Sequence, residues 1–260
     1  TESRRSRYAA VFTVMFLALF LMVLININTG TVNISVKEIL EILTAGREEG
    51  TGYHIIWQIR LPRILMAAIL GGALSLSGFL LQVFFHNPIA GPFILGISSG
   101  AKMMVALVMI CSAGSIGSMT SFALIGSAFG GSLISVSFVL LAAKRLRNMS
   151  ALLVAGIMIS YICSAVTDFI ITFAEDSDIV SLRGWSMGSF SGMNWGNVKV
   201  AAVVVAVTFA FTFLMSKPIG AYQMGEAYAR SMGVDIRIFR VILIVLSSVF
   251  SACVTAFAGP

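Results

Sequence analysis

The sequence predicts an all-α protein, a polytopic bundle of transmembrane helices, and three observations carry this prediction. Apolar residues make up 58% of the chain and charged residues only 11%, whereas a soluble domain has about 25% charged residues. The apolar residues form long continuous runs rather than alternating with polar ones, which excludes the strands of a transmembrane β-barrel. The basic residues lie in short clusters between these runs, as expected for loops at an anionic membrane surface.

Seven apolar runs are long enough to cross a bilayer, which takes about 20 residues. Because hydrocarbon offers no water to unpaired backbone groups, each run is expected to be helical, and residues 1–260 are expected to form a single transmembrane domain. The first run follows several arginines but is too long for a signal sequence. The approximate limits are Tyr8–Ile27, Ile64–Phe85, Phe93–Ser112, Met119–Ala143, Ala151–Phe173, Val198–Met215 and Val241–Ala258.

The distribution of Lys and Arg predicts that the N-terminus lies in the cytoplasm. In this orientation ten basic residues face inward and six face outward, which agrees with the positive-inside rule. The net charge of +6 is therefore assigned to membrane loops, and nucleic acid is not expected as a partner. Two outer segments, Asn28–Pro62 and Ala174–Asn197, are long, and Val36–Leu43 in the first is predicted to form a short surface helix.

Two arginines at the start of the second run, Arg60 and Arg63, lie on the predicted outer side, against the positive-inside trend. They flank Pro62, and because proline is favoured in the first turn of a helix, the helix is expected to begin there. The arginines either extend to the membrane interface or form a docking pair for an acidic partner on the outer face.

The stretch Asn87–Pro92 contains two prolines and a glycine within six residues and cannot form a regular helix. It is either a tight turn or irregular backbone, which membranes tolerate where it is buried in protein or lines a water-filled cavity. Further along the chain, Asp168 is an ionisable group inside the fifth run. Such a group is a candidate functional residue, although its place near the outer end weakens this interpretation.

The inner segment Ser216–Arg240 contains a second candidate site. Gly225–Met232 has a helix-forming composition, and Gly233 is a plausible stop. Glu226 and Arg230 stand four residues apart, a spacing that supports an ion pair on a helix surface. The helix is either a solvated loop element or a short cytoplasmic helix presented to another protein.

Several motifs are absent from the sequence. It has no G-x-x-x-x-G-K-[ST], so the chain is not expected to bind ATP, and its isolated cysteines and histidines predict no metal site. Ion-coupled carriers usually place several ionisable groups near the midplane, whereas only Lys102 and Asp168 fall within these runs away from their first residues. The energy for any transport is therefore expected to come from another protein.

Five separated motifs, in this order, resemble the FecCD-type permeases of type II ABC importers, which include cobalamin, haem and ferric-siderophore permeases. The resemblance covers about Trp57 to Pro260. The motifs are WQIRLPR at 57–63, SGFLLQ at 77–82, HNPIAGPFILGISSGA at 86–101, RLRNMSALLVAG at 145–156 and MGEAYARSMGV at 224–234.

This resemblance implies a multi-pass permease of the bacterial cell membrane that works as a homodimer or with a paralogous permease. It implies ten helices per permease, so C-terminal helices are expected to be missing from this chain. Two ATP-binding cassette subunits on the cytoplasmic side would bind ATP and Mg²⁺, and an extracytoplasmic substrate-binding protein would dock outside. The chain itself would bind no cofactor and catalyse no reaction.

Roles for particular residues follow from the same resemblance. Arg60 and Arg63 resemble the arginines that meet acidic residues of the binding protein. Gly225–Ile238 resembles the coupling helices that dock in the ATPase, and the residues contacting or shaping that interface would be Gly225, Glu226, Arg230 and Gly233.

The pathway residues are assigned in the same way. Asn87, Pro88, Met149 and Ser150 fall where the family narrows the pathway on the cytoplasmic side. The pore is expected on the dimer axis, lined mainly by the fifth helix, which carries Asp168. The expected function is ATP-driven import of an iron-siderophore or a related chelate, such as haem or cobalamin. An ion-coupled secondary transporter acting without an ATPase is the main alternative, and a membrane-embedded enzyme is a weaker one.

Overall fold

The structure, a computed structural model, describes residues 2–30, 32, 34–35, 38–39, 41–42, 50–111, 121–145 and 149–260. These residues are helical apart from turns and connecting segments, and no strand occurs among them. The all-α prediction is therefore confirmed. The chain divides into two compact units, Thr1–Ala68 with Ser191–Val198, and Ile69–Phe190 with Lys199–Pro260.

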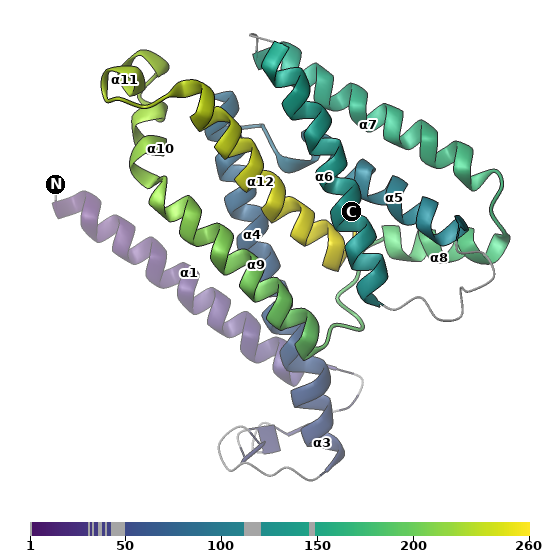
Figure 1. The fold of residues 1–260 in the computed structure, drawn as a ribbon. Coiled ribbons are helices and arrows are strands. Elements are labelled where there is room, and N and C mark those ends of the chain that lie inside the picture. Colours follow the sequence, from purple (N-terminus) through teal and green to yellow (C-terminus); the bar gives the residue numbers. More distant parts are fainter. Residues whose placement is uncertain are drawn as a thin grey trace. The chain divides into compact units, whose positions relative to one another are not determined.

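The first unit contains α1 and a long helix that changes pitch along its length (Figure 1). Its core consists of isoleucines from α1, from the stretch that follows it and from the π-helical turn. Ile39 and Ile42 of this core belong to the predicted surface helix Val36–Leu43, and the described residues of that piece have helical backbone. The elements are α1 (Glu2–Asn28), α3 (Thr51–His54), the π-helix η1 (Ile55–Arg60) and the start of α4 (Leu61–Phe85).

The second unit is a helical bundle in which α5 packs against both α6 and α7, and α12 packs against α6 (Figure 1). Short helices lie between the long ones. In chain order after α4, the elements are the 3₁₀-helix η2 (Pro92–Leu95), α5 (Ile97–Cys111), α6 (Ser121–Arg145), α7 (Met149–Ile171), α8 (Asp176–Ser186), α9 (Trp195–Leu214), α10 (Ser216–Gln223), α11 (Glu226–Ser231) and α12 (Ile236–Ala258).

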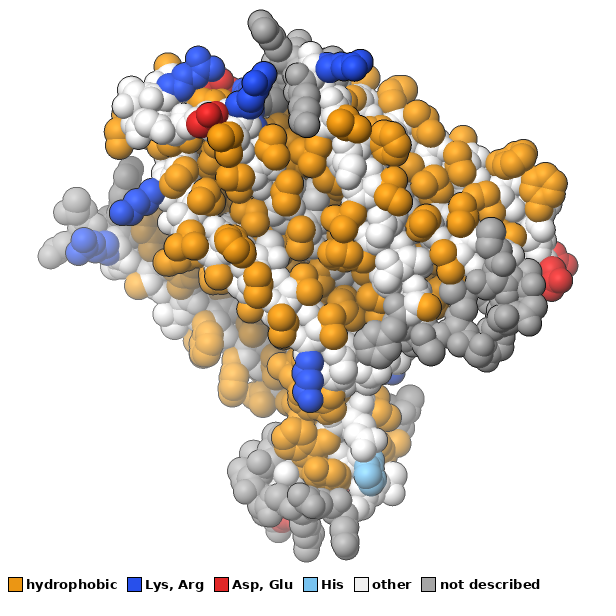
Figure 2. All heavy atoms as spheres, viewed as in Figure 1, with side chains coloured by type: hydrophobic (Ala, Val, Ile, Leu, Met, Phe, Trp, Pro, Cys, Tyr) orange, Lys and Arg blue, Asp and Glu red, His pale blue; other side chains and the backbone are white. Residues whose placement is uncertain are grey.

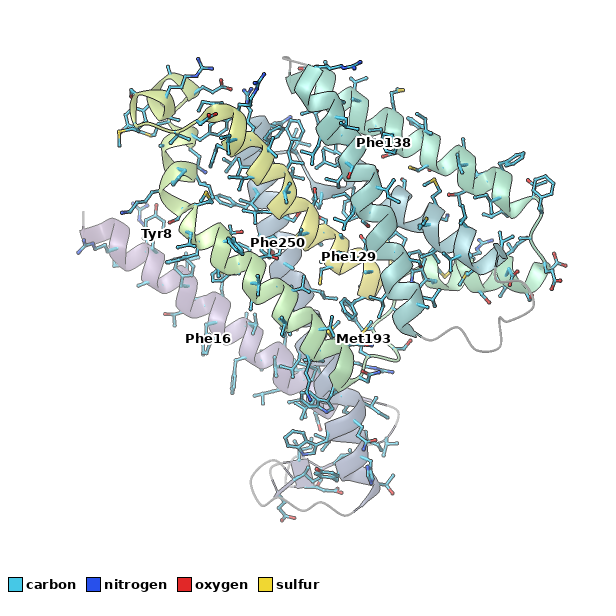
Figure 3. The ribbon with its side chains drawn as sticks, viewed as in Figure 1. Tyr8, Phe16, Phe129, Phe138, Met193 and Phe250 are labelled. Carbon is cyan, nitrogen blue, oxygen red and sulfur yellow. The ribbon has the colours of Figure 1, made fainter. Side chains whose placement is uncertain are left out.

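Six helical segments among the described residues are long and apolar enough to cross a membrane, where seven were predicted. Their outer surfaces are apolar (Figure 2). Phe16 of α1 is 68% exposed and Phe138 of α6 is 58% exposed, whereas Phe250 of α12 is fully buried (Figure 3). The spans are Arg5–Asn28, Thr51–Phe85, Ala123–Ala142, Ser150–Ile171, Trp195–Leu214 and Ile236–Ala258.

The prediction that Phe93–Ser112 forms one spanning helix is wrong. The run is divided at Gly96, which has a left-handed φ of +71°, so that a short 3₁₀-helix precedes the 15-residue α5. A Cβ on Gly96 would lie 2.9 Å from Oγ of Ser135, and the same hydroxyl donates to the Gly96 carbonyl at 2.9 Å. Contact with α6 therefore leaves no room for a side chain at position 96, and the helix break falls at this glycine.

The prediction that the second helix begins at Pro62 is also wrong. The helix is continuous from Thr51 to Phe85 and passes Pro62 just after the π-helical turn, in which the N–H of Leu61 bonds the carbonyl of Ile56. A π-helical N–H reaches five residues back, so the missing N–H of Pro62 leaves the Trp57 carbonyl without its helical donor. The Trp195 indole N–H donates to that carbonyl at 2.7 Å, which explains how the helix accommodates the proline.

Glycines allow the closest helix contacts in the second unit. A Cβ on Gly131 of α6 would clash with the Gly100 carbonyl of α5 and lie 2.6 Å from Cβ of Met104. On α7, a Cβ on Gly156 would clash with the Ile94 carbonyl of η2. Small residues therefore bring these helix backbones together, as is common in membrane bundles.

A buried hydroxyl cluster joins α4 to α12. Oγ of Ser77 lies 2.8 Å from Oγ of Ser247 and 2.6 Å from Oγ of Ser251, and Ser77 also donates to the Ser247 carbonyl at 2.9 Å. All three side chains are almost fully buried. Because each hydroxyl has a partner, this polar group stabilises the contact between two apolar helices without an unpaired atom.

Candidate functional site

The segment 216–240, which we call the α10–α11 segment, is a helix–turn–helix that leads into α12, and its residues up to Asp235 lie outside the candidate spans. Gly225, with φ +117°, begins α11, and Gly233, with φ +84°, ends it. The Gly233 N–H bonds the Arg230 carbonyl and the Val234 N–H bonds the Ala229 carbonyl, both at 3.0 Å, which is the Schellman pattern of a helix end. The predicted helix and the stop at Gly233 are therefore confirmed.

A buried tyrosine holds the two ends of this segment together. Tyr222 is fully buried, and its ring lies 5.2 Å from the ring of Phe239 on α12. Nε of Arg240 donates to the Tyr222 hydroxyl at 3.2 Å, and that hydroxyl donates to Oε1 of Glu226 at 3.4 Å. Burial raises the pKa of Tyr222 and outweighs the opposing effect of Arg240, so the phenol stays protonated at neutral pH.

Glu226 forms its ion pair with Arg240, and the predicted pair with Arg230 does not occur. The α10–α12 contact at Tyr222 and Phe239 brings Arg240 to the carboxylate from the next helix, a contact that spacing within α11 does not reveal. Both partners are partly exposed, so the pair contributes at most about 1 kcal/mol. Its main effect is to fix the direction of α11 relative to the start of α12.

The outward surface of the α10–α11 segment is both apolar and basic. Met224 is 73% exposed, Met232 is 63% exposed and Tyr228 is 47% exposed. Cationic side chains at Lys217, Arg230 and Arg237 are exposed around them, and Lys and Arg gather at this end of the bundle (Figure 2). Exposed methionines and a tyrosine surrounded by charges, on helices outside the spans, are typical of a protein interface.

The Asn87–Pro92 loop follows α4 directly. Oδ1 of Asn87 accepts from the Ile89 N–H at 3.0 Å, which forms a compact Asx turn, while Pro88 is exposed. The tight turn that was one of the two predicted alternatives is thus present in the loop, just before η2. His86, just before the loop, touches Tyr222 with ring centroids 4.7 Å apart. His86 was not predicted to have a role, although a histidine that precedes Asn-Pro at a helix end is a pattern that could have indicated one.

The predicted pathway residues lie on two neighbouring segments. Asn87 and Pro88 precede η2, and Met149 and Ser150 begin α7. The Met149 side chain lies outside the described residues, and Ser150 is exposed. Contact between η2 and α7 occurs two turns further along α7, where Gly156 meets the Ile94 carbonyl.

The two faces of α7 differ sharply. One face packs inside the bundle and carries Leu152, Gly156, Cys163 and Thr167. The opposite face is exposed along its length and mixes apolar and polar side chains. It includes Ser150, Val154, Ile157, Tyr161, Ser164, Asp168 and Thr172.

Arg60 and Arg63 have different surroundings. Arg60 is only 7% exposed, and its guanidinium donates to the carbonyls of Ile27, Asn28 and Val32. A Cβ on Gly30 would lie 2.9 Å from Cζ of Arg60, so that glycine leaves room for the side chain. Arg63, in contrast, is exposed. Arg60 therefore caps the C-terminal end of α1, where a cation also interacts favourably with the helix dipole.

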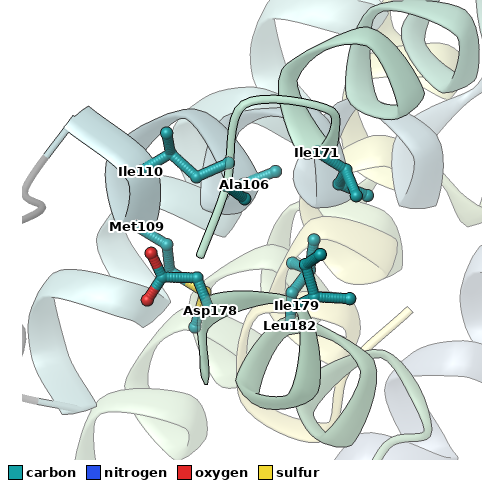
Figure 4. A pocket seen from close by; sticks show the side chains of 8 residues that line it. Ala106, Met109, Ile110, Ile171, Asp178, Ile179 and Leu182 are labelled. Atoms are coloured by element: carbon teal, nitrogen blue, oxygen red, sulfur yellow. The ribbon is translucent and has the colours of Figure 1, made fainter. Parts of the chain in front are cut away.

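No metal site is formed by the described residues, because no three His, Cys, Asp or Glu side chains gather closely enough. The carboxylate of Asp178 on α8 lies beside Met109 in a small apolar pocket (Figure 4). Asp178 is 3% exposed, and one of its oxygens has no hydrogen-bond partner among the described residues. A cavity of about 190 Å³ between η2, α5 and the end of α12 is lined largely by apolar residues.

Comparison with known proteins shows which family this chain belongs to. Residues 17–260 match the FecCD transport family. The chain is 34% identical over 209 residues to the vitamin B12 import system permease protein BtuC of Klebsiella pneumoniae, which covers 80% of this chain and 62% of BtuC. It is 30% identical over 247 residues to the hemin transport system permease protein HmuU of Yersinia pestis, which covers 94% of this chain and 72% of HmuU.

The fold comparison agrees. A solved structure described as an inward-facing conformation of a metal-chelate type ABC transporter superposes with a TM-score of 0.84 at 26% identity, over 97% of this chain and 77% of the other. Because the match to BtuC covers 62% of that protein, the chain spans less than two thirds of its length. From the family match, the relatives and the six apolar helices, the chain is an integral membrane protein that belongs to the FecCD transport family.

Proposed function

We propose that this chain is the membrane-spanning permease subunit of an ATP-driven importer, which passes a metal chelate from an extracytoplasmic binding protein to the cytoplasm. The α10–α11 segment is the observation that carries the proposal. It is a folded helix–turn–helix with an exposed surface of Met224, Tyr228 and Met232, held by buried Tyr222. A rigid element of this kind is suited to receive force from a docked partner.

The partner on this surface would be an ABC ATPase that holds ATP and Mg²⁺, because this chain has no nucleotide-binding motif. Exposed Arg230 and the methionines would contact the ATPase. Glu226 would act indirectly, since its carboxylate is already paired with Arg240. Gly225 and Gly233 would set the angles of α11 through their left-handed backbone. The chain itself would hydrolyse nothing.

The binding protein would dock on the extracytoplasmic side of the membrane, and the N-terminus would lie in the cytoplasm. Of the two arginines predicted to dock it, Arg63 is exposed and could pair with a carboxylate directly. Arg60 is occupied by three backbone carbonyls, so it would support docking by fixing the α1 end of the surface.

The exposed face of α7 would face a second permease, either an identical copy or a paralogue, across the transport pathway. Tyr161, Ser164 and Asp168 are exposed on this face, and polar groups at membrane depth face protein or water rather than lipid. Asn87, Pro88, Met149 and Ser150 would narrow the cytoplasmic end of the pathway.

The substrate class follows from the relatives, whose names specify vitamin B12 and hemin. Both are large metal chelates, and a ferric siderophore belongs to the same chemical class. We favour the siderophore. Because the described spans place few ionisable groups in the bundle, recognition is assigned to the binding protein and the pathway is expected to bind its cargo weakly.

The proposal is tested by reconstituting the permease in liposomes with its ATPase and binding protein. Uptake of ferric siderophore should require all components and ATP. Met232→Glu should weaken ATPase association by about tenfold or more, as expected for an interface anchor. Val180→Glu is the matched control, since Val180 is similarly exposed at 70% but lies on α8. Uptake driven by an ion gradient without the ATPase would instead support the secondary transporter.

A further inference from the structure

The end of α4 has an unusual backbone. His86 has φ +48° and is the only described residue other than glycine with a positive φ. Its N–H bonds the Val83 carbonyl at 3.3 Å, and the next N–H, of Asn87, bonds the Gln82 carbonyl at 3.1 Å. This is the Schellman pattern, in which glycine usually occupies the left-handed position. A histidine there carries a conformational cost, so it needs a compensating contact.

That contact is with the α10–α11 segment. Nε2 of His86 lies 3.3 Å from the Tyr222 carbonyl, and because a carbonyl only accepts, we assign the proton to this nitrogen. The His86 and Tyr222 rings also lie 4.7 Å apart. The carbonyl belongs to the last turn of α10, where a donor is favoured by the helix dipole. His86 thus links two segments 136 residues apart in the sequence.

On its other side, His86 is joined to the Asn87–Pro92 loop. The Asx turn at Asn87 and the bond from the Ala90 N–H to the Asn87 carbonyl at 3.1 Å make the start of this loop compact. The loop leads directly into η2, which contacts α7 at Gly156. A displacement of His86 is therefore carried to the loop and to η2 instead of being absorbed by a flexible connection.

We propose that His86 is a positioning residue that ties the Asn87–Pro92 loop to the α10–α11 segment, so that movement imposed on the segment is passed to the narrow end of the pathway. This inference rests on the proposed function. Tyr222 provides the opposing surface, and its own position is held by Phe239, Arg240 and Glu226.

The test uses the reconstituted importer and the variant His86→Gly. Glycine suits the left-handed position better than histidine, so the helix end is preserved while the ring contact is lost. The number of substrate molecules transported per ATP should fall by about fivefold or more, the lower limit of typical coupling between sites, while ATP hydrolysis continues. Gln82→Ala is the control, because the Gln82 side chain is exposed one turn before His86 on α4 and only its backbone carbonyl takes part in the helix end, so this variant should transport with normal coupling.

A second measurement reports the contact itself. Spin labels at Ile89→Cys and Gln223→Cys, both exposed positions, are placed in a chain lacking its native cysteines. Nucleotide binding should leave the distance between the labels unchanged when His86 is present and alter it in His86→Gly. If that variant is poorly folded, His86→Asn replaces it, since asparagine also tolerates this backbone.

The outcomes separate the two proposals. Normal coupling together with an unaltered label distance in His86→Gly would overturn the role of His86, even if wild-type uptake depends on ATP. Absence of ATP-dependent uptake by the wild-type complex would overturn the proposed function, whatever the label distances show.

Discussion

The contact between Gly100 and Gly131 provides the sharpest test of how this bundle is packed. An alanine Cβ at Gly131 would clash with the Gly100 carbonyl and lie 2.6 Å from Cβ of Met104. Carbon atoms normally approach to about 3.5–4.0 Å, so α5 and α6 would have to separate by roughly 1 Å. The opposing atoms include backbone, so a change of side-chain rotamer cannot relieve the clash.

The size of the effect follows from two opposing contributions. Overpacking a tight contact costs about 1–3 kcal/mol, and the rigid backbone here favours the upper part of that range. Replacing glycine by alanine inside a helix returns about 0.5–1 kcal/mol. We therefore expect Gly131→Ala to lower the free energy of unfolding by about 1–2 kcal/mol.

The neighbouring residue is a matched control. A Cβ on Gly130 would meet nothing within 4 Å, so Gly130→Ala should leave stability unchanged or raise it by about 0.5–1 kcal/mol. Unfolding of both variants in mixed dodecylmaltoside and SDS micelles, followed by circular dichroism, would measure the difference. Equal shifts for the two variants, or a Gly131→Ala variant as stable as the wild type, would refute the packing argument.

Two further predictions concern the first unit and the α10–α11 segment. Arg60→Ala removes a cation that is hydrogen bonded to three carbonyls and should lower the free energy of unfolding by about 2–4 kcal/mol in the same measurement, since water can replace only part of those bonds. The control is Arg63→Ala, which removes an exposed arginine and should change stability by less than about 0.5 kcal/mol. Equal losses for the two variants would contradict the assignment of Arg60 as the cap of α1. Because burial raises the pKa of Tyr222 above its ordinary value of about 10, the folded chain keeps this proton to higher pH than the unfolded chain, so stability should be unaffected below about pH 10 and fall above it. Tyr222→Phe should remove that part of the loss of stability at alkaline pH. The difference in absorbance near 295 nm between the wild type and this variant, followed with pH, should show that the Tyr222 phenol ionises at a higher pH than an exposed tyrosine. Ionisation at the usual pH would refute its burial.

Much of the candidate site was predictable because its signals are local. Gly233 ends α11 as its place after a helix-forming stretch indicated, and the Asn87–Pro92 loop is irregular because two prolines exclude helix. The partner of Glu226 was not predictable, since Arg240 reaches it only after α10 packs against α12. The functional roles assigned to Arg63, Arg230, Ser150 and Asp168 stay predictions until the complex is assayed.

The long apolar runs by themselves determined that the chain is all-α and crosses a membrane, because hydrocarbon excludes every backbone arrangement that leaves many polar groups unpaired. Tertiary structure decided where those runs break and which polar groups they bury. Gly96 divides the third run because Ser135 lies against it, and Arg60 turns inward because the end of α1 offers it carbonyl oxygens. Such outcomes depend on contacts between residues more than 25 positions apart in the sequence, which a pattern of neighbouring residues does not encode.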